Sequence, residues 1–412
     1  MNRVVVTGIG AITPLGNDVN TYWEQLKNGQ HGIAPITKFD ASQTGITVAA
    51  EVKGFDPSLT MDRKEYKRMD EFSQYAVAAT LEALNHAGLS DLSATVNPER
   101  VGVYVSSGIG GLPTMESGII KMHEKGPKRV PPLFVPLTIG NMVAGNISMK
   151  VGAKGSSLDI VTACASSTNA IGEAFRQIKH GYADVMIAGG SEGTITEIGI
   201  AGFAALTALS TATDPNRAST PFDKERQGFV MGEGAGILIL ENLEHAQKRG
   251  ATILAEVVGY GSNSDAYHMT APTPDGSGAG KAILLALSEA GITPEEVDYI
   301  NAHGTSTPTN DSAETTAIKY AFGKHAYSVA ISSTKSMTGH LLGGAGAIEA
   351  IACIKALEEG ILPPTANYQV SDEACDLDYI PNVARKKDAH YAISNSLGFG
   401  GHNAVLCFKK YQ

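Results

Sequence analysis

The sequence has little charge, few aromatic residues and only four cysteines. Charged side chains make up 18% of its 412 residues, whereas globular domains usually carry about 25%. Coiled coils and disordered chains need far more charge and less core-forming material, so both classes are excluded. Aromatic residues account for 6%, with a single tryptophan. The core must therefore be built from Ala, Val, Ile and Leu.

Basic residues are also scarce. The chain has 32 Lys and Arg against 42 Asp and Glu, a net charge of −10, which argues against a nucleic-acid partner. The four cysteines show no paired CxxC spacing, and this predicts reduced thiols and a cytoplasmic location. Residues 130–149 carry no charge, but three prolines argue against a membrane-spanning helix there. We expect no membrane anchor.

Short β-branched runs alternate with alanine-rich helical patterns along the chain, which predicts an α/β architecture. The clearest helical patterns cover residues 72–86, 165–179, 280–290 and 347–358. The second half also repeats the first. Residues 83–89 match residues 286–292, and the same kinds of strand, helix and glycine-rich turn follow each in the same order. These matches predict two similar halves, residues 1–250 and 251–412, packed back to back.

Cys164 is placed where a nucleophile would be. A strand-like run ends at this residue, and a helical pattern with one apolar face begins directly after it. Unpaired N–H groups and the positive end of the helix dipole at such an N-terminus stabilise a thiolate. The placement is similar to a nucleophile elbow, although the G-x-S-x-G spelling is absent. We predict that Cys164 is a nucleophile and that the other cysteines are structural.

Two histidines, His303 and His340, lie at the ends of predicted elements in the second half. His303 follows a strand, His340 precedes a glycine-rich turn and helix, and each is flanked by glycine. Two such histidines are a stronger functional signal than one. A zinc site shared with Cys164 is conceivable, but no HExxH or paired ligand spacing supports it. We therefore predict no metal.

Two glycine-rich segments have the flexibility to bring backbone N–H groups close to a ligand. Residues 396–403 fit either an oxyanion cradle or a simple hairpin turn. Residues 8–13 resemble a dinucleotide fingerprint, which would suit an NAD-dependent Rossmann oxidoreductase. Thr13 replaces the third glycine, however, and Pro14 would disturb the helix that receives the pyrophosphate. The oxidoreductase is therefore the weaker alternative.

Six motifs, in order across essentially the whole chain, resemble those of the β-ketoacyl-[acyl-carrier-protein] synthases, condensing enzymes of thiolase-type fold. They are TACASS (162–167), PFD (221–223), GFVMGEG (228–234), HGTST (303–307), KSMTGH (335–340) and GFGG (398–401). The chain is most similar to the bacterial synthase II type, because Ile109 stands where the synthase I type has glycine. His402 departs from the threonine of many members.

The resemblance implies a thiolase-like fold of two duplicated α/β halves, packed as a layered αβαβα sandwich. It also implies an acyltransferase of type II fatty acid synthesis that carries out a decarboxylative Claisen condensation. Cys164 would take the acyl group from a thioester, and His303 and His340 would stabilise the enolate formed from malonyl-carrier protein. Backbone N–H groups of Cys164 and Phe399 would receive the oxyanion, and 3-oxoacyl-carrier protein would be the product. No cofactor is implied.

The resemblance assigns further roles. Lys335 would organise the charges of the site, with Glu349 as its partner, and Phe399 would act as a gate over Cys164. The acyl pocket would be lined by Ile109, Gly199 and Phe203 and, across a homodimer interface, by Phe134. The pantetheine tunnel would be lined by Thr270, Thr305 and Thr307.

The acyl carrier protein implied as partner is typically acidic, so a chain of charge −10 needs local positive charge to bind it. Two basic clusters are candidates, and they predict docking contacts at Lys67, Arg68, Lys128 and Arg129. Ordinary solvated charges would explain the same clusters.

Other interpretations stay open. A synthase I-like enzyme or a type II polyketide ketosynthase would use the same chemistry on a different chain. A non-catalytic chain-length factor lacks the nucleophile, whereas Cys164 is present.

Overall fold

The computed structural model describes residues 1–412 as a mixed α/β fold around a ten-stranded sheet, with the strand order β10-β9-β13-β14-β8-β1-β7-β6-β4-β5. The first half contributes β1 (Val4–Ile12), β4 (Val101–Ser106), β5 (Ser157–Leu158), β6 (Val185–Glu192) and β7 (Gly234–Asn242). The second half contributes β8 (Ala255–Ser264), β9 (Tyr299–Asn301), β10 (Ala330–Ser332), β13 (Tyr391–Gly398) and β14 (His402–Lys410). The order is symmetrical about the β1–β8 pair. The duplication predicted from the sequence is therefore confirmed in the topology.

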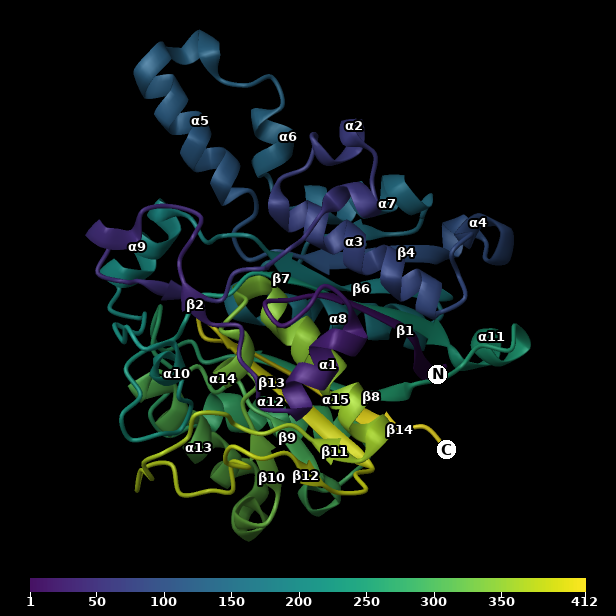
Figure 1. Cartoon of the computed structure of the whole chain (residues 1–412). Coiled ribbons are helices and arrows are strands. Elements are labelled where there is room, and N and C mark those ends of the chain that lie inside the picture. The colour runs from purple at the N-terminus through teal and green to yellow at the C-terminus, as the bar shows by residue number, and fades with distance from the viewer.

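Helices form three layers around these strands. Helices α3 (Glu71–His86) and α7 (Met142–Val151) cover the outer face of the first-half strands. Helix α12 (Ser277–Ala290), backed by α13 (Pro308–Phe322), covers the outer face of the second-half strands. Helices α8 (Ser166–Lys179) and α15 (Ala345–Glu359) contact strands of both halves and lie between them (Figure 1). The predicted αβαβα layering is confirmed.

The apolar side chains of each strand are shared between the cores on its two sides, because successive side chains of a strand point to opposite faces. In β7, Leu238 and Leu240 join the central core around α8 and α15, whereas Ile237 and Ile239 join the outer core beneath α3. The equivalent strand β14 divides its apolar residues between the central core and the core beneath α12 in the same way.

The dinucleotide-like segment, residues 8–13, lies within β1 and its end, and its glycines serve helix packing. A Cβ at Gly10 would fall against the carbonyl oxygen of Ala79 in α3, and one at Gly261 in β8 would fall against that of Ala282 in α12. The same close contact thus occurs once in each half. No helix opens at these glycines, because α1 begins only at Val19. The segment therefore does not form the dinucleotide-binding turn on which the Rossmann oxidoreductase alternative depended.

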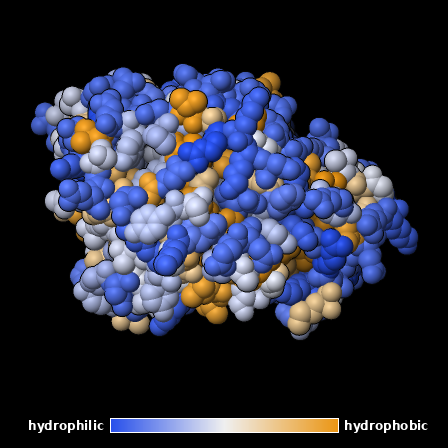
Figure 2. Space-filling view, turned by 90° about the horizontal axis from the view of Figure 1, so that it is seen from below, coloured by the Kyte–Doolittle hydropathy of each residue, from blue (hydrophilic) through white to orange (hydrophobic).

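Two helices project from the body of the molecule: α5 (Leu112–Lys125) and α6 (Phe134–Thr138) (Figure 1). The uncharged segment 130–149 supplies α6 and most of α7, and none of the chain's helices has both the length and the apolar character needed to cross a bilayer. The face seen in Figure 2 is mostly hydrophilic, with small apolar patches.

The remaining α-helices and strands are short. They are α1 (Val19–Lys27), α2 (Arg63–Tyr66), α4 (Leu92–Thr95), α9 (Glu197–Ala205), α10 (Pro215–Ala218), α11 (Leu243–Lys248), α14 (Lys335–Thr338), and the small sheets β2 (Ala34–Pro35) with β3 (Val48–Ala49) and β11 (Ile361–Leu362) with β12 (Arg385–Lys386).

Candidate active site

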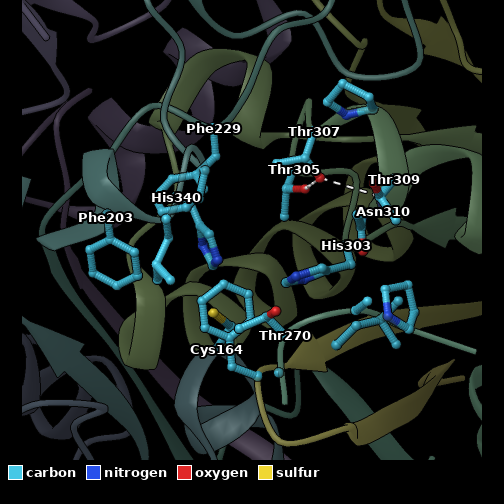
Figure 3. A pocket seen from close by; sticks show the side chains of 18 of the residues that line it. Cys164, Phe203, Phe229, Thr270, His303, Thr305, Thr307, Thr309, Asn310 and His340 are labelled. Atoms are coloured by element: carbon cyan, nitrogen blue, oxygen red, sulfur yellow. Dashed lines mark hydrogen bonds between the residues drawn. The ribbon is translucent and has the colours of Figure 1, made fainter. Parts of the chain in front are cut away.

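Cys164, His303 and His340 line one cavity of about 270 Å³. Figure 3 shows the two imidazoles next to the Cys164 side chain at the floor of this cavity. The three residues come from the segment before α8, the loop after β9 and the loop after α14. The fold therefore brings together the three residues that the sequence singled out, across both halves of the chain.

Cys164 lies in a single 3-10 turn, Ala163–Ala165, that leads directly into α8. Ala163 adopts a φ of +52°, a strained conformation for a residue with a side chain. The Ser166 hydroxyl braces the turn: it accepts a hydrogen bond from the Thr162 N–H (2.9 Å) and donates one to the Ala163 carbonyl (2.6 Å). This is the elbow-like placement expected for a nucleophile.

The acidity of Cys164 differs from the sequence-based expectation. Burial raises the pKa of the thiol to about 12, while the Lys335 charge and the backbone N–H groups of Cys164 and Phe399 act in the opposite direction. The residue is only 8% exposed. The free-energy cost of burying a thiolate is therefore larger than the electrostatic stabilisation that the helix N-terminus gives it. At neutral pH the Cys164 side chain is therefore a thiol and not a thiolate.

The two imidazoles stand nearly perpendicular, with ring centroids 5.3 Å apart. The Lys335 Nζ lies 3.4 Å from His303 Nδ1, and the Leu342 N–H donates to His340 Nδ1 at 3.3 Å. An ammonium group and a backbone N–H can only donate, so Nδ1 is the acceptor in both rings. Each histidine therefore carries its proton on Nε2 and can donate it to a ligand.

Both histidines are neutral near pH 7. Burial lowers the pKa of His303 and of His340 well below the usual value, and the Lys335 charge lowers both further. A neutral imidazole with its proton on Nε2 is a hydrogen-bond donor that keeps its proton, which suits an anionic intermediate that must stay reactive.

Lys335 and Glu349 form a fully buried ion pair, each with its side chain 1% exposed. Lys335 thus contacts both the carboxylate and His303. Burial raises the pKa of Glu349 to about 7, and the Lys335 charge opposes that rise. The pairing of Lys335 with Glu349 expected from the sequence is present in the structure.

A second buried carboxylate, Glu314 on α13, was not found by sequence analysis. It accepts hydrogen bonds from the backbone N–H groups of His303 (2.8 Å) and Gly304 (2.7 Å), and from the Asn395 amide (3.3 Å). Glu314 therefore fixes the backbone that carries His303. The only sequence signal is an acidic residue on the buried side of a helix. Other cavity residues that the sequence did not indicate include Gln227, Asp265 and Asn310.

The glycine-rich segment near the C-terminus is a hairpin turn that also lines the cavity. Gly398 pairs with His402 at the ends of β13 and β14, and Phe399 lies in the turn between them. The turn is tied to the loop 265–269 by hydrogen bonds from Gly400 N–H to the Met269 carbonyl and from Asp265 N–H to the Gly401 carbonyl, both 2.8 Å. The two interpretations left open for this segment are thus compatible.

Four of the expected substrate residues line the cavity: Phe203, Thr270, Thr305 and Thr307. The hydroxyls of Thr305 and Thr307 are 2.9 Å apart (Figure 3). Three others lie outside its lining. They are Ile109, which is 37% exposed, Gly199 in α9, and Phe134, whose ring packs against Gly118 of α5 in the same chain.

The four predicted docking residues, Lys67, Arg68, Lys128 and Arg129, are all exposed. Arg68 lines a separate groove whose apolar wall includes Leu133 and Pro136 of the α6 region.

No group of three or more His, Cys, Asp or Glu side chains has an arrangement that could hold a metal ion. Four buried oxygens at the junction of β9, β13 and α15 have no hydrogen-bond partner, on Asn301, Glu349, Ser394 and Asn395. Buried oxygens without a partner are the groups that internal water molecules usually satisfy.

The chain matches two family models, "Beta-ketoacyl synthase, N-terminal domain" over residues 1–246 and "Beta-ketoacyl synthase, C-terminal domain" over residues 254–369. It is 54% identical over 411 residues to a 3-oxoacyl-[acyl-carrier-protein] synthase 2 of Synechocystis sp., covering 100% of this chain and 98% of the relative. It is 51% identical over 410 residues to the Staphylococcus aureus protein of the same name, covering 100% and 99%.

Solved structures also match over their whole length. A β-ketoacyl synthase from Burkholderia phymatum superposes with a TM-score of 0.94 at 38% identity, with 100% of both chains covered. A type II polyketide ketosynthase, solved with its acyl-carrier protein and bound to a hexaketide, superposes with a TM-score of 0.93 at 36% identity and the same coverage.

Proposed function

Because the chain belongs to the β-ketoacyl synthase family, we infer that it is a condensing acyltransferase of type II fatty acid synthesis. It joins an acyl group held on the enzyme to malonyl-[acyl-carrier-protein], with loss of carbon dioxide, and releases 3-oxoacyl-[acyl-carrier-protein]. The observation that carries this conclusion is the single cavity shared by a cysteine at a helix N-terminus and two neutral histidines that donate from Nε2.

In the first half-reaction we assign the nucleophile to Cys164. Its sulfur attacks the carbonyl carbon of the acyl thioester, and the tetrahedral oxyanion accepts hydrogen bonds from the backbone N–H groups of Cys164 and Phe399. The intermediate then expels the carrier thiolate, which takes up the proton that the Cys164 thiol releases. The thiol pKa of about 12 supports this order, in which deprotonation accompanies attack.

In the second half-reaction we assign enolate stabilisation to His303 and His340. As the malonyl carboxylate leaves as carbon dioxide, its bonding electrons form an enolate whose oxygen accepts hydrogen bonds from the two Nε2–H groups. The enolate carbon attacks the acyl-Cys164 carbonyl, and the sulfur leaves as a thiolate, which is reprotonated. Lys335 keeps His303 in the donating tautomer by occupying its Nδ1, and its charge is balanced by Glu349.

The cavity walls suit the two parts of the substrate. Phe203 and Phe399, with ring centroids 6.4 Å apart, form an apolar side next to Cys164. We propose that Phe399 gates this side for the acyl chain, which extends toward Ile109, Gly199 and, in a homodimer, the partner's Phe134. Thr270, Thr305 and Thr307 form a polar side suited to a pantetheine arm.

The acyl carrier protein is the macromolecular partner of the reaction. We propose that it docks on the exposed cations Lys67, Arg68, Lys128 and Arg129.

Exposed apolar side chains on and beside α5 and α6, among them Ile119 and Val135, support a homodimer that forms through these two helices. Four free cysteines support a cytoplasmic location.

A polyketide ketosynthase is the second candidate, because a ketosynthase bound to a hexaketide is among the similar structures. The higher identity to fatty acid synthases favours the first. Incubation with acyl- and malonyl-carrier protein tests both. We expect carbon dioxide and one 3-oxoacyl product, and a poly-β-keto chain from repeated malonyl addition would favour the polyketide enzyme. Neither product with any acyl donor would refute the proposed reaction.

A further inference from the structure

A buried carboxylate, Glu192, lies at the end of β6 close to the site and has none of the roles described above. Its side chain is fully buried. Burial raises the pKa of Glu192 to about 7, and the groups that oppose this rise are a hydroxyl and backbone N–H groups, with no cation among them. Its charge also raises the pKa of Cys164. Because this negative charge makes the Cys164 thiolate harder to form, we expect a favourable contribution of Glu192 elsewhere in the site.

Four donors converge on this carboxylate. Oε1 accepts from the Ser107 hydroxyl (2.8 Å) and the Ile109 N–H (3.2 Å). Oε2 accepts from the N–H groups of Gly108 and Gly343, both at 2.9 Å. A carboxylate has about four acceptor positions, so all are used. Three of the four donors are backbone N–H groups, so the ionised carboxylate, which only accepts hydrogen bonds, is the form of the side chain that fits among them.

The bond to Gly343 holds the turn that orients His340. Leu342, one of the two residues between His340 and Gly343, has a φ of +48°, which side-chain-bearing residues rarely adopt. In that conformation its N–H donates to His340 Nδ1 at 3.3 Å. A Cβ at Gly343 would lie 2.8 Å from Glu192 Oε2, so the turn can approach the carboxylate only because it has glycine there.

The other two backbone bonds hold the segment after β4. Gly108 lies against the Ala163 carbonyl, one residue before Cys164, and a Cβ at Gly108 would again lie 2.8 Å from Glu192 Oε2. One carboxylate therefore connects the backbone beside the nucleophile with the backbone beside His340.

We propose that Glu192 is a positioning residue for the condensation. It holds the Leu342–Gly343 turn so that His340 keeps Nδ1 as an acceptor and presents Nε2–H to the enolate. The same negative charge makes Cys164 a weaker acid. The proposal rests on the proposed function, because the enolate is the group that His340 serves.

The test is Glu192→Gln, in which a side chain of the same shape replaces an acceptor oxygen by a donor. We expect carbon dioxide release from malonyl-carrier protein to fall roughly 10- to 100-fold, the effect of losing a hydrogen bond to a charged group. Alkylation of Cys164 by iodoacetamide at pH 8 should become faster, because the neighbouring negative charge is gone.

The matched control is Glu82→Gln. Glu82 is a partly buried carboxylate outside the cavity, and it accepts hydrogen bonds from the Ala11 and Val19 N–H groups. This change should leave both rates unchanged.

Rates that move in opposite directions support the proposal, because general loosening of the fold would not raise one and lower the other. Unchanged carbon dioxide release, or a parallel fall of both rates, would overturn it. If Glu192→Gln does not fold, Ser107→Ala removes one donor and keeps the carboxylate, and carbon dioxide release should fall by a smaller factor with alkylation unchanged. A fall in both rates there, or in neither, counts against the role. A wild-type enzyme that forms no 3-oxoacyl product refutes the proposed function itself, whatever the variants do.

Discussion

Replacing Lys335 by methionine separates the contribution of the buried ion pair to stability from its contribution to catalysis. Lys335 and Glu349 are each 1% exposed. Removing one partner of a buried pair leaves an uncompensated charge and typically costs about 3–5 kcal/mol. For a chain of 412 residues, whose unfolding entropy is large, we expect Lys335→Met to lower the melting temperature by roughly 4–6 °C. Glu349 already has a pKa raised to about 7 by burial, and loss of the cation raises it further.

The catalytic effect of the same change has a different cause. Without the ammonium group, His303 Nδ1 loses its donor and the ring can adopt either tautomer. A charged hydrogen bond contributes about 1.5–3 kcal/mol, so condensation should fall roughly 10- to 150-fold. Alkylation of Cys164 should also slow, because Lys335 lowers the pKa of that thiol.

The double variant Lys335→Met with Glu349→Leu distinguishes the two effects. Apolar residues of similar volume often replace a buried ion pair without loss of stability. We therefore expect the melting temperature to return close to the wild-type value while condensation stays at the level of the single variant. The measurements are thermal unfolding and 3-oxoacyl product formation. If the double variant recovered both stability and activity, the assignment of Lys335 to the His303 tautomer would be refuted.

Three further predictions concern the nucleophile and the partner. Cys164→Ser should abolish acyl transfer while Cys353→Ser retains it, and mass spectrometry should locate the acyl group on Cys164; a label on another cysteine contradicts the assignment. Because burial raises the pKa of Cys164 to about 12, its alkylation rate should rise about tenfold per pH unit from pH 7 to 9, and a plateau in that range would show a more acidic thiol. Changing Lys67 and Arg68 to glutamate should raise KM for acyl-carrier protein several-fold and weaken its salt dependence, since exposed charges are screened over about 10 Å, while a small acyl-thioester mimic reacts as before. Equal loss with both substrates would instead indicate a structural role for the two cations.

The sequence predicted those features that depend on local pattern. The helical patterns at 72–86 and 165–179 correspond to α3 and α8 within one residue at each end, because alanine-rich amphipathic spacing is a local signal. The matched helix ends at 83–89 and 286–292 predicted the duplication, and the structure explains them by one strand–helix contact repeated in each half. Cys164 was found because the start of a helix is visible in a single short segment. The strand expected to end at Cys164 was wrong, since β5 covers only Ser157–Leu158 and the chain up to the 3-10 turn at Ala163 is irregular.

Features that depend on tertiary contacts were not predictable in this way. The helix N-terminus suggested an acidic Cys164, but the sign of its pKa shift is set by burial, which many distant segments contribute. Glu314 and Glu192 accept hydrogen bonds mainly from backbone N–H groups of other segments. Because every residue type except proline carries that N–H group, no residue pattern marks the donors.

The duplicated fold explains how one site can combine the proposed nucleophile with two hydrogen-bond donors. Strands β4 and β9 occupy equivalent places in the two halves of the sheet, and the loop after each is anchored by a buried carboxylate. Glu192 holds Gly108 and Ile109 after β4, and Glu314 holds His303 and Gly304 after β9. The same architectural solution thus fixes backbone in both halves, but only the second half places an imidazole there. Cys164 enters from the first half through α8, whose contacts with strands of both halves bring it to the histidines. Rigid backbone anchors on both sides keep three side chains from distant segments in one cavity, and preorganised donors of this kind stabilise developing negative charge without rearrangement during the reaction.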